Sequence, residues 1–552
     1  MIRLVVLYFF ILLSISLQGQ HDKVIRTFIN GYEYKKAQLK TDSHFIHSDF
    51  IKSYSEMVMT RANNVLCLDS VKNDSNGSSF YFHLLPKYSF LVLLKDSVNN
   101  SIEKQVFTTH YYSKIHRLLD KHITQMENSG FPFAEMVLDS ININAKDSVT
   151  LSYRLFKNVS IVYDSIDVIG KPMVSKNFLS AYTGIIAGNR YNEKNIKRFD
   201  RLMNDLVFVR QQKKSDLFFI DSKAKLRVYL EKQSANNFSG LIGIANGTNN
   251  QLQFTGDVTI NLKNIFKHAD MCDISWKKIG EQSQRLDLAF SYPYLFNIAV
   301  GASTKFNLYK QDSTYLNSQL KAGLMFYTQG FNGMLVYYEQ RQTSVLKYTT
   351  SGLAATNCQF AGLNFINNRF NKPILPEKGY SLSIDAAYGQ RTLSKTPQMP
   401  DSIYSKLSKK VEQWRGNASF ISLIPLTTSF FIKFKAEGGA ISPGQFKNEL
   451  FRLGGSQSIR GFDEESIYAS SYLLTSAELR LSLDNATQWF VFFDKLMYKS
   501  FIYTDNPWGI GVGAELNTGA GLFFISYALG SQFNQSLEFR NSKIHFGYRN
   551  RF

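Results

Sequence analysis

The sequence predicts a chain in two parts, a mixed α/β N-terminal region followed by an antiparallel β-barrel that spans a membrane. The chain begins with an apolar segment typical of export, and helical periodicity disappears near residue 236. Aromatic residues make up 14% of the 552 residues, and no second apolar run reaches the length of a membrane helix. These observations leave a soluble envelope protein or a transmembrane barrel, and the strand pattern described below favours the barrel.

The composition excludes several other classes of protein. Apolar residues make up 44% of the chain and charged residues 19%, which is too apolar for a disordered protein. The three cysteines, Cys67, Cys272 and Cys358, are far apart and argue against a zinc site or a disulfide framework. The net charge of +19 is explained by basic rims facing anionic lipid headgroups, because export argues against a nucleic-acid partner.

Residues 1–20 predict a secretory signal peptide. Arg3 and the amino terminus form a short positive region, and the segment from Leu4 to Leu17 is almost entirely apolar. About fourteen apolar residues fit a signal peptide and fall short of the ~20 that a spanning helix needs. A retained membrane anchor is the alternative, and the cleavage point stays open because the sequence has no A-x-A triplet.

Residues 21–236 mix helical and strand periods. Apolar residues at helical spacing predict helices over residues 113–130 and 193–206. Each helix is followed by two predicted strands, a pattern that recurs after about 75 residues and indicates an internal repeat. These strands span residues 133–143, 148–156, 216–220 and 225–230.

The segment that begins KNVSIVYD at residue 157 and extends to residue 209 resembles a POTRA domain, a β-α-α-β-β module. The preceding ENSGFPFAEMVLDSININ resembles the turn and strand that follow the helices of such a module. The resemblance implies a degenerate POTRA-like module at residues 21–95, a second at 96–158 and a third at 159–236. An unrelated α+β domain is the alternative.

Residues 237–552 predict the barrel. Segments of nine to twelve residues alternate strictly, as in Tyr380–Tyr388 and Leu473–Leu483, and Gly, Asn, Asp and Ser separate them. One face of each segment is rich in Phe, Tyr and Leu and the other carries charges, as expected for a lipid-facing wall around a wet lumen. The 316 residues give about 20 for each of sixteen strands, although fourteen or eighteen strands are also compatible.

The most specific motif is FRLGGSQSIRGF at residues 451–462. It resembles the sixth-loop motif of the bacterial surface antigen superfamily, whose members include BamA, TamA and two-partner secretion transporters. The segments 477–483, 490–496 and 508–530 continue the resemblance in the right order, but Leu496 stands where the family usually has Gly. The motif residues are Gly454, Gly455, Ile459, Arg460, Gly461 and Phe462.

The resemblance implies that Arg460 lies against Asp494, and strand alternation puts Glu478 on the same lumenal face. A carboxylate can grip the planar guanidinium with two hydrogen bonds, which would anchor a loop folded into the lumen. The glycines of the motif would let the loop turn tightly and lie against the wall. The alternative is a surface hairpin with a solvated Arg460. We interpret the neighbouring residues 463–465, Asp-Glu-Glu, as a charge run at the loop tip.

The C-terminal segment has the pattern of a strand that closes a barrel. Ile544, Phe546 and Tyr548 alternate with polar residues, and the chain ends on Phe552. Outer-membrane barrels typically close with such a strand, which the assembly machinery recognises. We therefore interpret these four residues as an assembly signal.

The sequence contains no GxSxG, HExxH or P-loop motif, so we expect no enzyme activity, no cofactor and no metal site. The resemblance to BamA and TamA implies that the chain inserts other proteins into the outer membrane of a Gram-negative bacterium by strand templating. The POTRA region would lie in the periplasm. The implied partners are outer-membrane lipid, unfolded outer-membrane protein clients, and periplasmic or lipoprotein accessory factors. The alternatives are a two-partner secretion transporter and a passive receptor or porin-like barrel.

Overall fold

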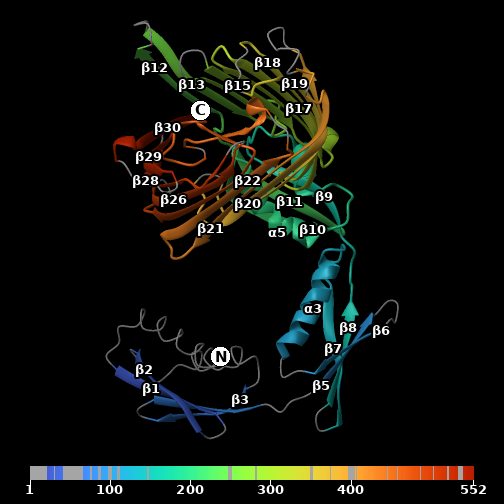
Figure 1. Ribbon diagram of the computed structural model, residues 1–552. Coiled ribbons are helices and arrows are strands. Elements are labelled where there is room, and N and C mark those ends of the chain that lie inside the picture. Colours follow the sequence, from blue (N-terminus) through green and yellow to red (C-terminus); the bar gives the residue numbers. More distant parts are fainter. Residues whose placement is uncertain are drawn as a thin grey trace. The chain divides into compact units, whose positions relative to one another are not determined.

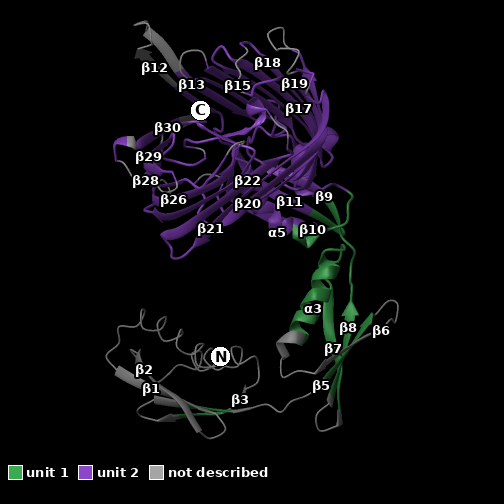
Figure 2. Ribbon diagram, in the orientation of Figure 1, with its two compact units in different colours: residues 1–163, 188–194, 221–224 green, residues 164–187, 195–220, 225–552 purple. Residues whose placement is uncertain are grey.

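The structure, a computed structural model, divides into two compact units, which are described separately (Figure 2). Unit 1 contains residues 1–163, 188–194 and 221–224, and unit 2 contains residues 164–187, 195–220 and 225–552. In the described part of the chain, no helix is both long enough and apolar enough to cross a membrane. The structure describes residues 21–29, 32–41, 66–74, 77–84, 89–96, 102–108, 112–145, 148–246, 252–279, 283–347, 352–372, 375–395, 404–405, 407–443, 446–456, 458–484, 487–500, 503–518, 521–532 and 539–551.

The first sheet of unit 1 consists of β1 (His21–Ile29), β2 (Tyr32–Thr41), β3 (Leu66–Asp74) and β4 (Gly77–Leu84). The strand order is β2-β1-β4-β3, with the two central strands parallel and each outer strand antiparallel to its neighbour. Phe80 and Phe82 of β4 are buried. This sheet lies within the first predicted module.

The second sheet is built from β5 (Ser89–Asp96), β6 (Ile102–Thr108), β7 (Glu135–Ala145) and β8 (Ser148–Phe156), in the order β6-β5-β8-β7. Helix α3 (Tyr112–Glu127) packs Ile115 and Leu118 against apolar side chains of β5 and β8. The sequence analysis placed residues 89–95 in the first module, but β5 pairs in parallel with β8. The second module therefore begins at or before Ser89, because parallel pairing needs the long crossover through β6, α3 and β7.

The third sheet has the order β10-β11-β9 and is formed by β9 (Val162–Ile169), β10 (Val209–Ile220) and β11 (Lys223–Lys232). Helix α5 (Glu193–Asp205) buries Phe199, Leu202 and Met203 at helical spacing. Helix α4 (Lys176–Thr183), which periodicity alone did not predict, ends at Gly184 in the left-handed conformation with φ of 74°. Strand β10 begins seven residues before the predicted strand, because its polar first half reads as a loop in sequence.

Sixteen long strands of unit 2 pair antiparallel in chain order and close into a barrel (Figure 1). The predicted fold class and strand number are confirmed for the described residues. A two-residue strand, β27 (Thr504–Asp505), adds to the end of β26. The long strands are β12 (Asn237–Asn246), β13 (Leu252–Lys263), β14 (Met271–Ile279), β15 (Ser283–Tyr292), β16 (Val300–Gln311), β17 (Tyr315–Gln329), β18 (Asn332–Val345), β19 (Ala355–Phe370), β20 (Gly379–Ser394), β21 (Lys410–Pro425), β22 (Phe430–Ile441), β25 (Ser471–Ser482), β26 (Thr487–Lys499), β28 (Trp508–Thr518), β29 (Gly521–Ser531) and β30 (Lys543–Arg551).

The wall of the barrel separates apolar from polar side chains as predicted. On β26, Val491 and Phe493 are about half exposed on the outer face, whereas Asp494 on the opposite face is buried. The same alternation on β25 exposes Leu479 and buries Glu478. Successive strand residues point to opposite faces, so one row contacts lipid and the other lines the lumen.

The third sheet and its helices dock on the turns at one end of the barrel, which we call the module end. Tyr294, just before the short helix η1 (Leu295–Asn297), lies with its ring centroid 5.6 Å from that of Phe178 and 5.7 Å from that of Tyr182 of α4. The Tyr294 hydroxyl donates to the Gly330 carbonyl at 2.5 Å. Burial raises the pKa of Tyr182, so its hydroxyl stays neutral and donates to the Leu202 carbonyl.

The connection between β22 and β25, residues 442–470, leaves the opposite or loop end and folds into the lumen. We call it the lumenal loop. It contains the short helix η2 (Lys447–Glu449) and a small hairpin of β23 (Phe451–Leu453) and β24 (Ile467–Ala469). The helix η3 (Phe539–Asn541) precedes β30. The described residues of the predicted motif all lie in this loop.

Candidate functional site

Arg460 of the lumenal loop meets Asp494 of β26 in a bidentate ion pair. Its Nε donates to Asp494 Oδ2 at 2.8 Å and its Nη2 donates to Oδ1 at 2.7 Å. The Arg460 backbone N–H donates to Oδ2 at 3.1 Å. The guanidinium also donates to Ser476 Oγ and stacks on the Phe492 ring, with Cζ 3.5 Å from the ring centroid. Because the Asp494 side chain is 0% exposed, these charge-assisted contacts are shielded from bulk water.

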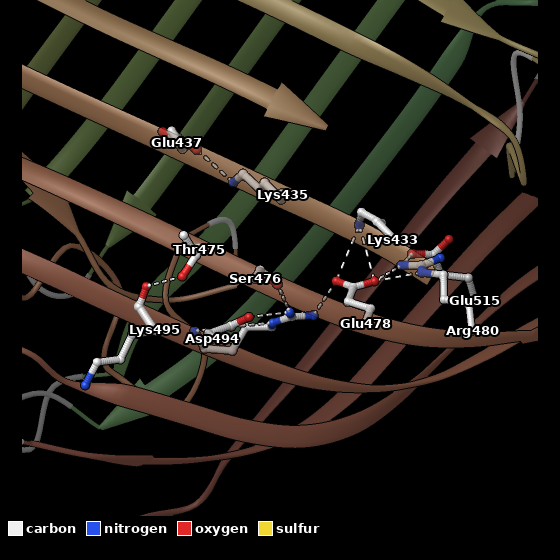
Figure 3. Close-up of polar contacts among 11 residues, drawn as sticks. Lys433, Lys435, Glu437, Thr475, Ser476, Glu478, Arg480, Asp494, Lys495 and Glu515 are labelled. Carbon is white, nitrogen blue, oxygen red and sulfur yellow. Dashed lines mark hydrogen bonds and ion pairs between the residues drawn. The ribbon is translucent and has the colours of Figure 1, made fainter. Parts of the chain in front are cut away.

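Glu478 of β25 extends this pair into a network (Figure 3). Its carboxylate lies 3.0 Å from Arg460 Nη1, 2.7 Å from Arg480 Nη2 and 3.4 Å from Lys433 Nζ. Arg480 also contacts Glu515 at 3.1 Å. Three cations and three carboxylates thus share one patch of wall, which offsets much of the cost of desolvating each charge. The lumenal charge network consists of Lys433, Arg460, Glu478, Arg480, Asp494 and Glu515.

Strand geometry explains why these side chains meet. Ser476 and Asp494 are directly opposite across β25 and β26, and Glu478 is opposite Phe492. Positions two apart on one strand share a face, so Arg480 continues the same row. The Arg480 guanidinium lies over Phe490, which is its cross-strand partner, as Arg460 lies over Phe492. Sequence analysis missed both phenylalanines, because lumenal aromatic residues look like lipid-facing ones in sequence.

The backbone of the motif lies directly on glycines of the wall. A Cβ on Gly509 of β28 would lie 2.2 Å from the Arg460 carbonyl oxygen, and one on Gly530 of β29 would lie 2.6 Å from the Gly461 carbonyl oxygen. Gly461 itself has a φ of 90°, which favours glycine. Sequence analysis placed residues 508–530 in the family pattern but did not identify these two glycines as the surface on which the loop rests.

The family's usual glycine at position 496 is replaced by a packing residue. Leu496 is completely buried and packs against Ile459 and Leu453 of the lumenal loop. Phe462 contacts the same apolar cluster from its edge. At this position a side chain therefore fills the space between wall and loop, while the close backbone approach occurs at Gly509 and Gly530.

The charge run at residues 463–465 lies at the loop tip, as we interpreted it, and its carboxylates form ion pairs that the sequence did not predict. Glu465 forms an ion pair with Arg285 of β15 and lies 3.3 Å from Arg452 of β23, and its side chain is only 15% exposed. Asp463 is the exposed member, at 76%. Folding the tip back over β23 turns it toward the lumenal wall. No charge pattern in the sequence reveals that contact, because Arg285 lies 180 residues earlier.

The two first glycines of the motif hold the tip in this position. Gly454 and Gly455 have φ values of 113° and 94°, which side-chain-bearing residues rarely adopt. A Cβ on Gly455 would lie 1.9 Å from Glu464 Oε2, and one on Gly454 would lie 2.2 Å from the Asp463 carbonyl oxygen. The tip therefore packs directly onto the glycine pair.

The C-terminal strand presents apolar side chains outward. Ile544 and Phe546 are 70% and 59% exposed, and the Tyr548 ring packs 4.6 Å from that of Phe523. Phe552 lies outside the described residues. The assembly role assigned to these four residues stays a prediction.

A cavity of about 520 Å³ remains in the lumen beside the loop. Its lining is mostly polar or charged and includes Lys305, Lys321 and Asp385 from the wall and Glu449 from the loop. Lys321 and Asp385 pair at 2.8 Å. Among the described residues, no group of His, Cys, Asp or Glu side chains is arranged to hold a metal ion.

Comparison with known proteins identifies the family. The chain resembles CdiB from Acinetobacter baumannii with 13% identity and a TM-score of 0.53, covering 97% of this chain and 91% of that one. It resembles CdiB from Escherichia coli with 12% identity and a TM-score of 0.52, covering 85% and 91%. BamA from Haemophilus ducreyi lacking POTRA domains 1–3 is 12% identical, with a TM-score of 0.43 and coverage of 81% and 95%. No curated protein matches the sequence.

The likeness to the two CdiB structures shows the fold, and the family follows from the sequence itself. Residues 245–552, more than half of the chain, match the Omp85 superfamily domain. This segment contains nearly the whole barrel, the lumenal loop and every described residue of the charge network. The chain therefore belongs to the Omp85 superfamily of outer-membrane β-barrel proteins.

Proposed function

We propose that this protein inserts other β-barrel proteins into the outer membrane by pairing their strands with its own at the β12–β30 seam. The single observation that carries the proposal is how little of this seam is paired. In the described residues, β12 and β30 pair only through Asn237 opposite Arg551 and Phe238 opposite Asn550. On its other side, β12 pairs with β13 along its full length.

The unpaired part of β12 is a strand edge whose backbone N–H and C=O groups lack hydrogen-bond partners from β30. Backbone N–H and C=O groups without partners cost several kcal/mol each in lipid, because no water is present to bind them. An extended client strand lowers this cost by adding to the edge, and its main-chain hydrogen bonds need no particular sequence. The seam can thus template a first strand for clients of different sequence.

The contents of the lumen favour the seam, rather than the lumen itself, as the surface on which clients bind. The loop and its charge network occupy the wall formed by β25, β26, β28 and β29. Beside the loop, the lumen holds a cavity of about 520 Å³ and a second of about 360 Å³ lined by Lys433, Arg480 and Glu515. Export of a polypeptide through the barrel would first require the lumenal loop to leave its position.

In this proposal the module end of the barrel faces the periplasm, and the N-terminal sheets meet unfolded clients in that compartment. The edge strands of these sheets offer further sites for strand addition, and accessory periplasmic or lipoprotein factors would bind there. Strand exchange needs no covalent step, so we propose that the protein is not an enzyme and uses no cofactor.

A reversible seam disulfide tests the proposal. Continuing the register of Asn237 opposite Arg551 places Ser239 opposite Arg549. Ser239→Cys with Arg549→Cys, in a chain whose native cysteines are replaced by serine, seals the seam on oxidation. A matched control joins the same β12 position to the other neighbour, through Ser239→Cys and Thr259→Cys, which are opposite in β12 and β13.

In proteoliposomes, insertion of an unfolded outer-membrane protein should fall to the protein-free rate in the oxidised seam variant and recover after reduction. The control disulfide should leave insertion unchanged. Equal insertion by both oxidised variants would refute seam templating. Depletion of the protein from cells then separates the alternatives, because loss of many barrels supports insertion, loss of one exported protein supports a secretion transporter, and no change supports a passive barrel.

A further inference from the structure

The tip of the lumenal loop binds both sides of the β12–β30 seam. On one side, Asp463 pairs with Lys543, the first residue of β30, at 2.6 Å. On the other side, Glu464 lies 3.7 Å from Lys277 of β14, and Glu465 pairs with Arg285 of β15. Three consecutive carboxylates therefore reach over β12 and β13 from within the lumen.

These contacts lie where the seam lacks backbone pairs. Lys543 stands at the loop end of β30, whereas Asn550 and Arg551, which pair with β12, stand at the module end. Lys277 and Arg285 flank the β14–β15 connection, which is also at the loop end. The carboxylates and the backbone pairs thus hold opposite ends of one seam.

Contacts within the loop fix the conformation of the tip. Glu465 has a φ of 55°, a conformation that non-glycine residues adopt only when surrounding contacts impose it. Its N–H donates to the Gly454 carbonyl at 3.3 Å, and Arg452 holds its carboxylate from the loop side. Because the tip is ordered as one piece, forming each further ion pair costs less conformational entropy than forming an isolated surface pair.

We propose that Asp463, Glu464 and Glu465 form an electrostatic clasp that joins β30 to β14 and β15 across the seam and limits how far the seam opens at the loop end. Releasing the clasp frees β12 and β30 to separate over the stretch that backbone hydrogen bonds do not hold. The effect of the clasp on client insertion rests on the proposed function. Its effect on the seam itself is independent of what the seam binds.

The experiment measures the seam directly in the full-length protein in lipid nanodiscs. Spin labels at Ile244→Cys on β12 and Ile544→Cys on β30, opposite in the continued register, report the strand separation. The native cysteines are replaced by serine. In the triple variant Asp463→Asn, Glu464→Gln and Glu465→Gln, we expect the long-distance population to rise by about fivefold, because one exposed ion pair changes a population by up to about that factor and three pairs are removed.

Two controls separate the clasp from a general effect of charge removal. Glu437→Gln removes an ion pair within β22, in which Glu437 Oε2 lies 2.8 Å from Lys435 Nζ. This pair does not cross the seam, so the distances between the spin labels should stay unchanged. The exchange Asp463→Lys with Lys543→Asp restores an ion pair of reversed polarity, so in an otherwise unaltered tip the seam should keep the distances of the unaltered chain.

The remaining outcomes also decide the proposal. Raising NaCl from 0.05 to 1 M should widen the seam in the chain with an unaltered tip, because partly exposed pairs are screened, and this test applies even if the triple variant fails to fold. Unchanged distances in the folded triple variant, or no salt effect, would overturn the clasp. Distances that respond while client insertion does not would leave the clasp intact and refute strand templating.

Discussion

Removing the Arg460 side chain should release the lumenal loop from the barrel wall. In Arg460→Ala, Asp494 loses both guanidinium contacts, at 2.7 and 2.8 Å, and keeps the loop backbone N–H at 3.1 Å. Truncating one member of a buried pair costs about 3–5 kcal/mol, because the other charge stays buried. Glu478 loses less, since Arg480 and Lys433 still contact it. A cost near 3 kcal/mol increases the undocked fraction of the loop by roughly a hundredfold.

Limited proteolysis measures this fraction in assembled barrels. A broad-specificity protease should be used, because trypsin would lose a cleavage site in the variant. When opening and closing are faster than cleavage, the cleavage rate within residues 451–465 follows the open population. Heat modifiability of the same sample shows that the barrel itself has assembled. We expect an assembled barrel with cleavage at least about a hundredfold faster than in the unaltered chain.

A double-mutant cycle shows whether Arg460 and Asp494 act through one contact. Asp494→Ala should be milder than Arg460→Ala, because Arg460 keeps Glu478 at 3.0 Å and Ser476 at 2.9 Å. The double variant should be scarcely worse than Arg460→Ala, which is a strong departure from additivity. Arg460→Lys should also open the loop, since an ammonium group cannot donate two parallel hydrogen bonds or stack as a plane.

The barrel provides a matched control for the cycle. Lys435 and Glu437 lie two residues apart on the same face of β22 and form an ion pair at 2.8 Å, with side chains 22% and 29% exposed (Figure 3). Lys435→Ala should cost about 0–1 kcal/mol and leave loop cleavage unchanged. Additive effects of the two single variants, a normal Arg460→Lys protein, or equal cleavage in Lys435→Ala would refute the buried lock.

Three further changes test the glycines of the wall, the C-terminal residue and the boundary before the barrel. Gly509→Ala should expose the loop as Arg460→Ala does, because its Cβ would lie 2.2 Å from a loop carbonyl, whereas Gly416→Ala meets its nearest atom at 3.8 Å and should be silent in the same cleavage assay. Deleting Phe552 should reduce the heat-modifiable barrel in the membrane without reducing synthesis or export, and an equal yield would show that the terminal residue is no assembly signal. The fragment 21–236 should be soluble and protease-resistant with mixed α/β circular dichroism, and a product that aggregates without detergent would contradict this boundary.

The sequence sufficed for the fold class because a barrel wall is periodic. On β25, Ser476, Glu478 and Arg480 alternate with the apolar residues Ala477, Leu479 and Leu481, so their shared lumenal face follows from a strand period of two. The bidentate partner Asp494 came from the resemblance rather than from periodicity, since alternation selects a face and not a partner. The N-terminal sheets are less regular, and the long crossover between β5 and β8 hid the true start of the second module.

What the sequence could not reveal depends on contacts between distant segments. Phe490 and Phe492 belong to the lumen because Gly511 and Gly513 of β28 leave space for their rings, with a Cβ at either glycine falling 2.4–2.5 Å from a ring carbon. The ion pair of Glu465 was not predicted, because its partner Arg285 is remote in sequence. Each case requires knowing which residues lie beside one another in the folded barrel, and a one-dimensional pattern does not contain that information.

The arginine and glycine of the motif act as one geometric unit. Asp494 binds both the side chain and the backbone N–H of Arg460, so it fixes the loop backbone as well as the guanidinium. With the loop backbone fixed in this way, the Arg460 carbonyl lies against Gly509 and the Gly461 carbonyl lies against Gly530. A methyl group at either wall glycine would have no room. A buried ion pair is by itself weak evidence for stability, because desolvation offsets much of its attraction. Its value here is positional, because the loop can rest on the two wall glycines in a single register.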